Sequence, residues 1–184
     1  MKNLIYISGP ITDNKTGQPR EGWQERFRAA EEKLRGMGFE VINPIDIAPK
    51  AEKYWNVLVE TRQSMKLTAC DYIPPTPRWL YIERCIDELS NHCRAISLFS
   101  DPLKAVANGR LLGLYVIGDI HDLPFSYGTM CEINFALAAG LPVWSEYFDG
   151  EQMDNMFWVR PGLTLAETAS ALDAEVKSKK IHEE

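Results

Sequence analysis

One glutamate stands in a segment where a charge needs an explanation. Glu132 lies between Gly128 and Gly140, and nearly every other residue of that segment is apolar or small. Gly128 permits a tight turn, and Gly140 followed by Pro142 ends the helix that the segment predicts. Such a helix is expected to be packed on most sides. A carboxylate held there has either a partner or a chemical role as an acid, a base or a nucleophile.

The same residues also have a purely structural interpretation. Thr129 and Glu132 have the spacing of a capping box, in which the glutamate accepts a hydrogen bond from the N-cap amide and the helix dipole favours its charge. Capping boxes are common at helix starts, so the pattern alone favours capping over catalysis. Observations from other parts of the chain are needed to reverse that order.

The start of the chain predicts a strand–helix–strand unit. Residues 4–8 form a short apolar, β-prone run that ends in the turn sequence Ser8-Gly9-Pro10. Residues 22–37 predict a helix with one apolar stripe, and residues 39–42 predict a second strand. A unit of this kind favours a parallel sheet with a right-handed crossover.

The remaining chain predicts further strands and helices. Residues 45–80 are harder to interpret, although 54–59 could lie on a helix. Helices are expected at 78–91, from Thr129 onward and at 165–176, followed by a frayed, solvated end. Strands are expected at 95–99, 141–145 and 157–159, and the three prolines in 71–77 predict an irregular loop. Residues 102–125 are interpreted as an insertion, in which 111–117 form an extra strand or a hairpin.

The order of these elements predicts an α/β fold: a doubly wound, open parallel sheet of about five strands flanked by helices. In such sheets ligands bind beyond the carboxyl ends of the strands. Residues 8–10, 100–101 and 126–132 are all expected at such ends. Because these segments would meet at one edge of the sheet, we favour a functional role for Glu132.

Composition excludes several classes of protein. The 184 residues fit one domain with a C-terminal arm at about 149–184, and the net charge of −6 argues against a nucleic-acid binder. No apolar run approaches the ~20 residues of a membrane span. Four cysteines without paired spacing, and no signal peptide, predict reduced thiols in the cytoplasm. No cluster calls for a metal, and no cofactor is expected.

Several motifs resemble the nucleoside 2-deoxyribosyltransferase family and its relatives, the deoxynucleoside 5′-monophosphate N-glycosidases. Residues 6–12, Tyr-Ile-Ser-Gly-Pro-Ile-Thr, resemble the opening motif, and 41–44, Val-Ile-Asn-Pro, the second strand and turn. Ser126-x-Gly128-x-x-x-Glu132, followed by Gly-Leu-Pro-Val at 140–143, is similar to the catalytic motif. The resemblance covers roughly two thirds of the chain in segments.

The resemblance implies cleavage of the N-glycosidic bond of a 2′-deoxynucleoside or its 5′-monophosphate. Positive charge develops at the anomeric carbon, and a carboxylate can form a covalent ester there, which a second base or water resolves. Glu132 would be that nucleophile, kept ionised by its place near a helix start. The substrate would contact Tyr6, Ser8, Gly9, Pro10, Ser126 and Gly128. Ordinary turn chemistry is the alternative for both serines.

One position departs from the family pattern. The family has an aspartate in the helix before the third strand, where it handles the proton of the departing base. Cys85 occupies that position here. Either the alignment slips, or Asp87 or Glu83 substitutes, or the acid is missing. Asp87 is thus a catalytic candidate, although it points roughly 200° away from Cys85 on a helix and a solvated surface charge is the alternative.

A last resemblance concerns assembly. Residues 153–157 are similar to the family's C-terminal segment, which reaches into a neighbouring subunit's site. Asn155 would then contact the sugar of the partner's substrate, in a homo-oligomer (a dimer or higher) with composite active sites; a polar loop residue is the alternative.

The expected ligands are deoxynucleosides or deoxynucleotides and free nucleobases, with no nucleic acid and no membrane as partners. The sequence leaves transfer and hydrolysis open. It favours unphosphorylated nucleosides, because no dense serine and arginine cradle for a phosphate lies near Ser8. The competing function is a non-catalytic nucleotide-binding or sensing module on the same fold. A dinucleotide-dependent oxidoreductase is disfavoured because no GxGxxG follows the first strand.

Overall fold

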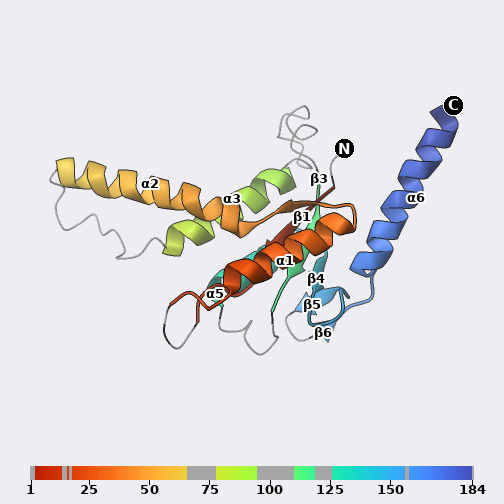
Figure 1. Cartoon of the computed structure of the whole chain (residues 1–184), viewed down its shortest axis with the longest axis horizontal. Helices are drawn as coiled ribbons and strands as arrows, with labels where there is room; N and C mark the ends of the chain where they lie inside the picture. The colour runs from red at the N-terminus through yellow and green to blue at the C-terminus, as the bar shows by residue number, and fades with distance from the viewer. Residues whose placement is uncertain are drawn as a thin grey trace.

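A computed structural model describes residues 3–13, 16, 18–65, 78–94, 110–118, 126–155 and 158–183 of the chain. In order, these form β1 (Asn3–Ser8), α1 (Trp23–Gly36), β2 (Glu40–Ile42), α2 (Pro44–Met65), α3 (Arg78–Arg94), β3 (Arg110–Val116), α5 (Tyr127–Ala138), β4 (Val143–Ser145), β5 (Met153–Asn155), β6 (Trp158–Val159) and α6 (Leu165–Glu183) (Figure 1).

The centre of the molecule is a parallel sheet with the strand order β2-β1-β3-β4. Strand β1 pairs with β2 on one side and with β3 on the other, and β3 pairs with β4. The chain therefore moves outward in one direction from β1 to β2 and in the other from β3 to β4. The strand order thus switches between β1 and β3. In sheets of this kind, ligands bind beyond the carboxyl ends of the strands at that point.

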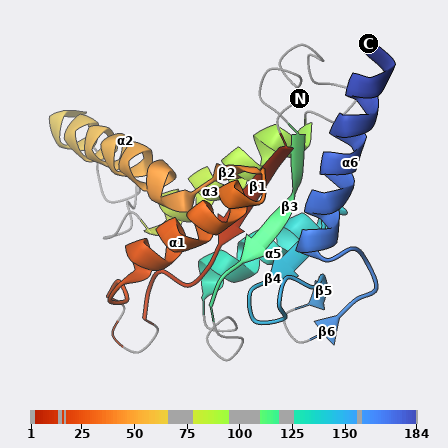
Figure 2. The same cartoon turned by 45° about the vertical axis from the view of Figure 1, so that its right-hand side comes forward.

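Helices cover both faces of the sheet, which confirms the predicted α/β sandwich. Alternate residues of β1 point to opposite faces: Ile5 and Ile7 pack with α1 and the start of α6, whereas Leu4 and Tyr6 pack with α3 and α5. In Figures 1 and 2 helix α1 lies on one side of the strands and α5 on the other, while α2 extends away from the body. The side of α3 and α5 is the one that receives Tyr6 and Ser8.

Several predictions of individual elements are confirmed. The expected helix at 22–37 is α1, and its apolar stripe is buried at Phe27, Ala30 and Leu34. The strand at 39–42, the helix at 78–91 and the strand at 141–145 correspond to β2, α3 and β4. Gly140 has the left-handed φ of 72° expected for the residue that ends α5. The predicted strand 95–99, the loop 71–77 and the segment 100–101 lie outside the described residues.

Other expectations need correction. Of the two alternatives for 111–117, the strand is right, since residues 110–116 form β3. Its assignment to an insertion is wrong, because β3 pairs on both sides and lies inside the sheet. Helix α6 continues to Glu183, so the end expected to fray after residue 176 is helical. Helix α5 is packed on most sides, as expected, but one face is open: Tyr127 is 69% exposed, and Cys131 and Asn134 on the same face are exposed as well. The helix is an outer layer of the sandwich, so one of its faces meets solvent.

Candidate active site

Glu132 is positioned by two neighbouring elements of the fold. It lies on the inner face of α5 with only 6% of its surface exposed. Tyr6 and Ser8 are two residues apart on β1 and therefore point to the same face of the sheet. The Tyr6 hydroxyl donates to Oε1 of Glu132 at 2.8 Å, and the Ser8 hydroxyl donates to Oε2 at 2.5 Å. Each carboxylate oxygen thus receives one hydroxyl donor from β1.

The capping-box interpretation of Glu132 is wrong. Helix α5 begins at Tyr127 after the N-cap residue Ser126, so Glu132 is the sixth helical residue and lies beyond the first turn. Its carboxylate bonds to the side chains of Tyr6 and Ser8. Thr129, the supposed cap, instead shares a 2.8 Å hydrogen bond with the hydroxyl of Ser126.

The expectation that the helix start keeps Glu132 ionised is also wrong. Burial raises the pKa of Glu132 from 4.5 to about 7, and the hydrogen bonds from Ser8, Tyr6 and the Cys85 thiol offset only part of this rise. Within the described part of the chain no cation forms an ion pair with it. The loss of water around a carboxylate with neutral partners outweighs the helix dipole, which acts only over the first turn. The group is therefore close to half ionised at neutral pH.

The donors around Glu132 stay protonated. Burial and the nearby charge of Glu132 raise the pKa of Tyr6 well above 10. The same two causes raise the pKa of the Cys85 thiol far above its usual value, so Cys85 is a neutral hydrogen-bond donor at neutral pH. Position 85 is the one where the family resemblance expects an aspartate, and the side chain found there contacts Glu132.

Glu132 opens into a cavity of about 420 Å³ at the switch in strand order. Its walls come from the turn after β1, the start of α1, the first turns of α2, the first half of α3 and the start of α5. Of the predicted binding residues, Gly9, Ser126 and Gly128 line this cavity together with Glu132. Gly9 has no space for a side chain, since a Cβ there would lie 2.5 Å from the side chain of Ile117.

Tyr6, Ser8 and Pro10 lie beneath this surface rather than on the cavity wall. Tyr6 and Ser8 are fully buried and contact Glu132 from below, so they hold the carboxylate. Pro10 is buried beside Gly118, at the bottom of the turn that carries Gly9. Asn155 ends β5 in the two-stranded sheet β5–β6, and its side chain is outside the described part of the molecule.

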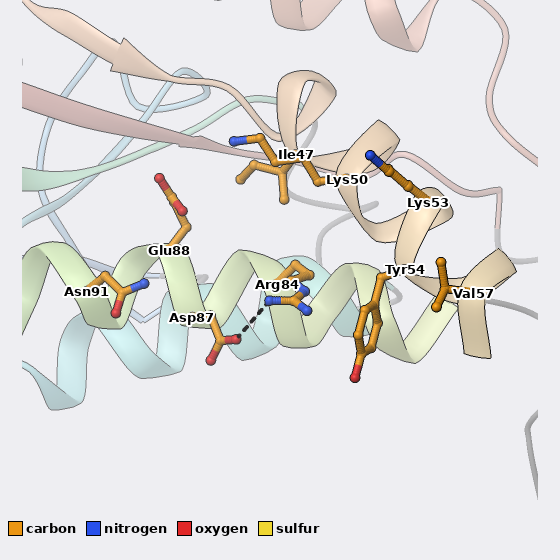
Figure 3. A pocket seen from close by; sticks show the side chains of 9 residues that line it. All are labelled: Ile47, Lys50, Lys53, Tyr54, Val57, Arg84, Asp87, Glu88 and Asn91. Atoms are coloured by element: carbon orange, nitrogen blue, oxygen red, sulfur yellow. Dashed lines mark ion pairs between the residues drawn. The ribbon is translucent and has the colours of Figure 1, made fainter. Parts of the chain in front are cut away.

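The structure does not bring Asp87 to Glu132. Asp87 lines a separate pocket of about 400 Å³ between α2 and α3 (Figure 3). Its side chain is 58% exposed and forms a long ion pair of 3.9 Å with Arg84. Figure 3 shows Asp87 beside Arg84 on α3, with Lys50 and Lys53 on α2 above them. Asp87 is therefore a surface charge on another side of α3, and Glu83 is likewise exposed.

The cavity also contains residues that the sequence did not single out as site residues. Trp23 lines the cavity at the start of α1. Glu52 and Tyr81 line it from α2 and α3, and the Tyr81 hydroxyl donates to Oε1 of Glu52 at 3.0 Å. These two residues are 29 positions apart, and no local motif links them. Only the packing of α2 against α3 brings them together.

No group of three or more histidine, cysteine, aspartate or glutamate side chains that could hold a metal ion occurs among the described residues. Within the same residues, no helix has the length and apolar character needed to span a membrane.

Comparisons with known proteins give one match. A family described as "Domain of unknown function (DUF4406)" matches residues 3–81. This range contains β1, α1, β2, α2 and the start of α3, and therefore Tyr6, Ser8, Glu52 and Tyr81, but it ends before Glu132. No curated protein and no solved structure matches the chain.

Proposed function

We propose that the protein cleaves the N-glycosidic bond of 2′-deoxynucleosides through a covalent ester on Glu132. With water as the acceptor it is an N-glycosidase, and with a second free base it is a deoxyribosyltransferase. The observation that carries the proposal is the Glu132 carboxylate itself. It is buried on the floor of a cavity, each oxygen accepts from one hydroxyl, and its pKa is raised to about 7.

The chemistry follows from these contacts. The bond from C1′ to the base nitrogen breaks, and its electron pair leaves with the base. One oxygen of ionised Glu132 donates a pair to the electron-poor C1′ and forms an ester. Tyr6 and Ser8 remain hydrogen-bonded to the carboxylate and hold it in place during the attack. Water or a second base then attacks C1′ from the face opposite Glu132, and the C1′–O bond breaks with its electron pair returning to the Glu132 carboxylate. The proton released by the incoming water or base balances the proton that the departing base takes up.

The size and lining of the cavity suit a nucleoside. Its volume of about 420 Å³ falls in the usual range for small-molecule pockets. Trp23 and Tyr81 supply aromatic surface against which a base can pack. Among the residues described as lining the cavity there is no lysine or arginine, and Glu52 adds a carboxylate. This favours an uncharged sugar over a 5′-phosphate, for which only the amides at the start of α5 remain.

The departing base needs a proton, and Cys85 is a poor source of it. The raised pKa of its thiol makes it a weak acid. The other described residues that donate to Glu132 are weak acids as well, so these residues leave water as the proton source or departure of the base as an anion. This observation favours a second candidate function, a module that binds deoxynucleosides or deoxynucleotides without turnover. A homo-oligomer in which Asn155 reaches the partner's site stays a prediction from the family resemblance.

Chromatography of purified protein incubated with the four common deoxynucleosides and their 5′-monophosphates, with and without a second free base, tests the proposal. A new nucleoside means transfer, and free base alone means hydrolysis. Glu132→Gln should abolish either product, whereas Glu31→Gln, which changes a buried glutamate on the other face of the sheet, should not. If no substrate turns over but the same ligands raise the melting temperature, the protein is a binding module and the catalytic proposal is wrong.

A further inference from the structure

A second polar pair lines the same cavity and takes no part in the chemistry at Glu132. Tyr81 of α3 donates a hydrogen bond of 3.0 Å to Glu52 of α2. Tyr81 lies one helical turn before Cys85, whose thiol contacts Glu132. The pair therefore lies on the wall of the same cavity, on the part of α3 that adjoins the Glu132 contact.

The pair of Glu52 and Tyr81 offers a ligand hydrogen-bond acceptors and no free donor. Burial and the neighbouring Glu52 raise the pKa of Tyr81 to about 12, so its hydroxyl keeps its proton and directs it at Glu52. What remains for a ligand is the second oxygen of Glu52 and the lone pairs of both groups, all of them acceptors. Within the described chain, Tyr81 is the one hydrogen-bond partner of the Glu52 side chain. The wall therefore suits a ligand edge that carries N–H donors.

We propose that Glu52, held by Tyr81, is the specificity-determining residue of the cavity and selects nucleobases that present an exocyclic amino group. This inference rests on the proposed function, because it assumes that the cavity holds a nucleoside. A carboxylate accepts well from an amino group, and best from adjacent N–H and amino donors such as those of guanine. A base that turns a carbonyl oxygen toward Glu52 leaves two acceptors facing each other, which disfavours binding.

Binding is the readout that separates this inference from the catalytic proposal. Dissociation constants are measured by calorimetry for two matched pairs: deoxyguanosine against deoxyinosine, and deoxycytidine against deoxyuridine. The first pair differs only in the amino group, so its ratio reports recognition of that group directly. In the second pair a carbonyl oxygen replaces the amino group and N3 becomes a donor, so its ratio reports the exchange of the whole donor and acceptor pattern. We expect the wild-type protein to bind the amino-bearing member about tenfold more tightly, the factor for one hydrogen bond to a charged group that is partly open to solvent.

Three variants sharpen the measurement. Glu52→Gln replaces one acceptor by a donor and should bring the ratio close to one. Tyr81→Phe frees Glu52 to rotate and should reduce the ratio by a smaller factor. Glu83→Gln makes the same chemical change at an exposed site on α3 and should leave the ratio unchanged. Circular dichroism confirms that each variant is folded, which is expected because Glu52 is exposed on its helix.

The outcomes are distinct. If nucleosides bind with the expected ratio but no bond is cleaved, the catalytic proposal fails and this inference stands. If nucleosides are cleaved and the ratio is the same in wild type and Glu52→Gln, this inference is overturned and the catalytic proposal stands. If no nucleoside binds at all, both are overturned.

Discussion

Two buried glutamates on opposite faces of the sheet have opposite electrostatic surroundings. Glu31 of α1 is 8% exposed and Glu132 of α5 is 6% exposed. Glu31 forms ion pairs of 2.7 Å with Arg28 and 2.8 Å with Arg35, and it accepts from Asn43 at 2.8 Å. Among the described residues, the groups that donate to Glu132 are uncharged hydroxyls and a thiol.

The consequence is a difference in the direction of the two pKa shifts. Burial alone would raise the pKa of Glu31, but the hydrogen bonds and charges of its partners outweigh burial and lower it. At Glu132 burial dominates and raises the pKa to about 7. The charge of Glu31 is balanced by two arginines, so Glu31 stays ionised. The pKa of Glu132 instead lies near neutral pH, where the group can gain or lose its proton. Such tuning is typical of functional groups.

The largest expected difference between the two sites is in turnover. Glu132→Gln removes the nucleophile, so kcat should fall on the order of 10⁴-fold, as in other enzymes that lose a nucleophile. Glu31→Gln should leave kcat within about twofold. The measurement is initial rate per folded protein for the best deoxynucleoside. Equal losses in both variants would mean that Glu132 has no special chemical role.

The two substitutions should change the free energy of unfolding in opposite directions. The raised pKa of Glu132 means that its protonated form stabilises the fold below pH 4.5, and that this contribution is lost as pH rises through 7. Glu132→Gln should therefore stabilise the protein by up to about 3 kcal/mol at pH 8, with no gain near pH 4.

Glu31 has a lowered pKa, so its contribution is present at neutral pH and is lost as pH falls through that lowered value. Glu31→Gln should cost about 1 kcal/mol at pH 8, because both arginine partners are at least half exposed. Urea unfolding at pH 4 and pH 8 measures both effects. A destabilised Glu132→Gln protein at pH 8 would contradict the raised pKa.

Turnover should increase with pH where the nucleophile ionises. With a pKa of about 7, the ionised fraction of Glu132 rises about tenfold between pH 6 and pH 8. Ser8→Ala removes a donor to the carboxylate, so the midpoint of kcat against pH should move about one unit upward. Thr16→Ala, an exposed hydroxyl in the loop after β1, is a control that should leave the midpoint in place. An activity that falls over this range would instead assign Glu132 the role of an acid.

The smallest expected effect is at Cys85. Cys85→Ser replaces a weak thiol donor by a hydroxyl at the same place beside Glu132, which should lower the midpoint of the pH profile by a few tenths of a unit. Cys131→Ser, on the exposed face of α5, should not change it. A shift in both variants would show that the change is not transmitted through contact with Glu132.

The sequence predicted the parts of this structure that depend on local patterns. The apolar stripe of α1 follows from periodic burial on one face of a helix, and the β-prone run of β1 follows from continuous burial on both faces of the sheet. The sequence also indicated Glu132, because a charged residue is unusual in an otherwise apolar helix. Position 85 was identified from the resemblance, and the structure places the Cys85 side chain against Glu132.

What the sequence missed depends on contacts between distant segments. The spacing of Thr129 and Glu132 fits a capping box, but the helix begins two residues before Thr129, and Tyr6 and Ser8 lie more than 120 positions away from Glu132. Strand β3 was assigned to an insertion because glycines surround it, although pairing on both sides defines it as part of the sheet. The contact between Glu52 and Tyr81 arises only when α2 and α3 pack.

Mass spectrometry of the protein quenched in acid during reaction with a deoxynucleoside tests the role of Glu132 most directly. We predict that wild-type protein gains the mass of one deoxyribosyl group, that peptide mapping places the group on Glu132, and that Glu31→Gln gains it equally while Glu132→Gln does not. Turnover without any such mass gain, or a group attached to another residue, would contradict the assignment of Glu132 as the nucleophile.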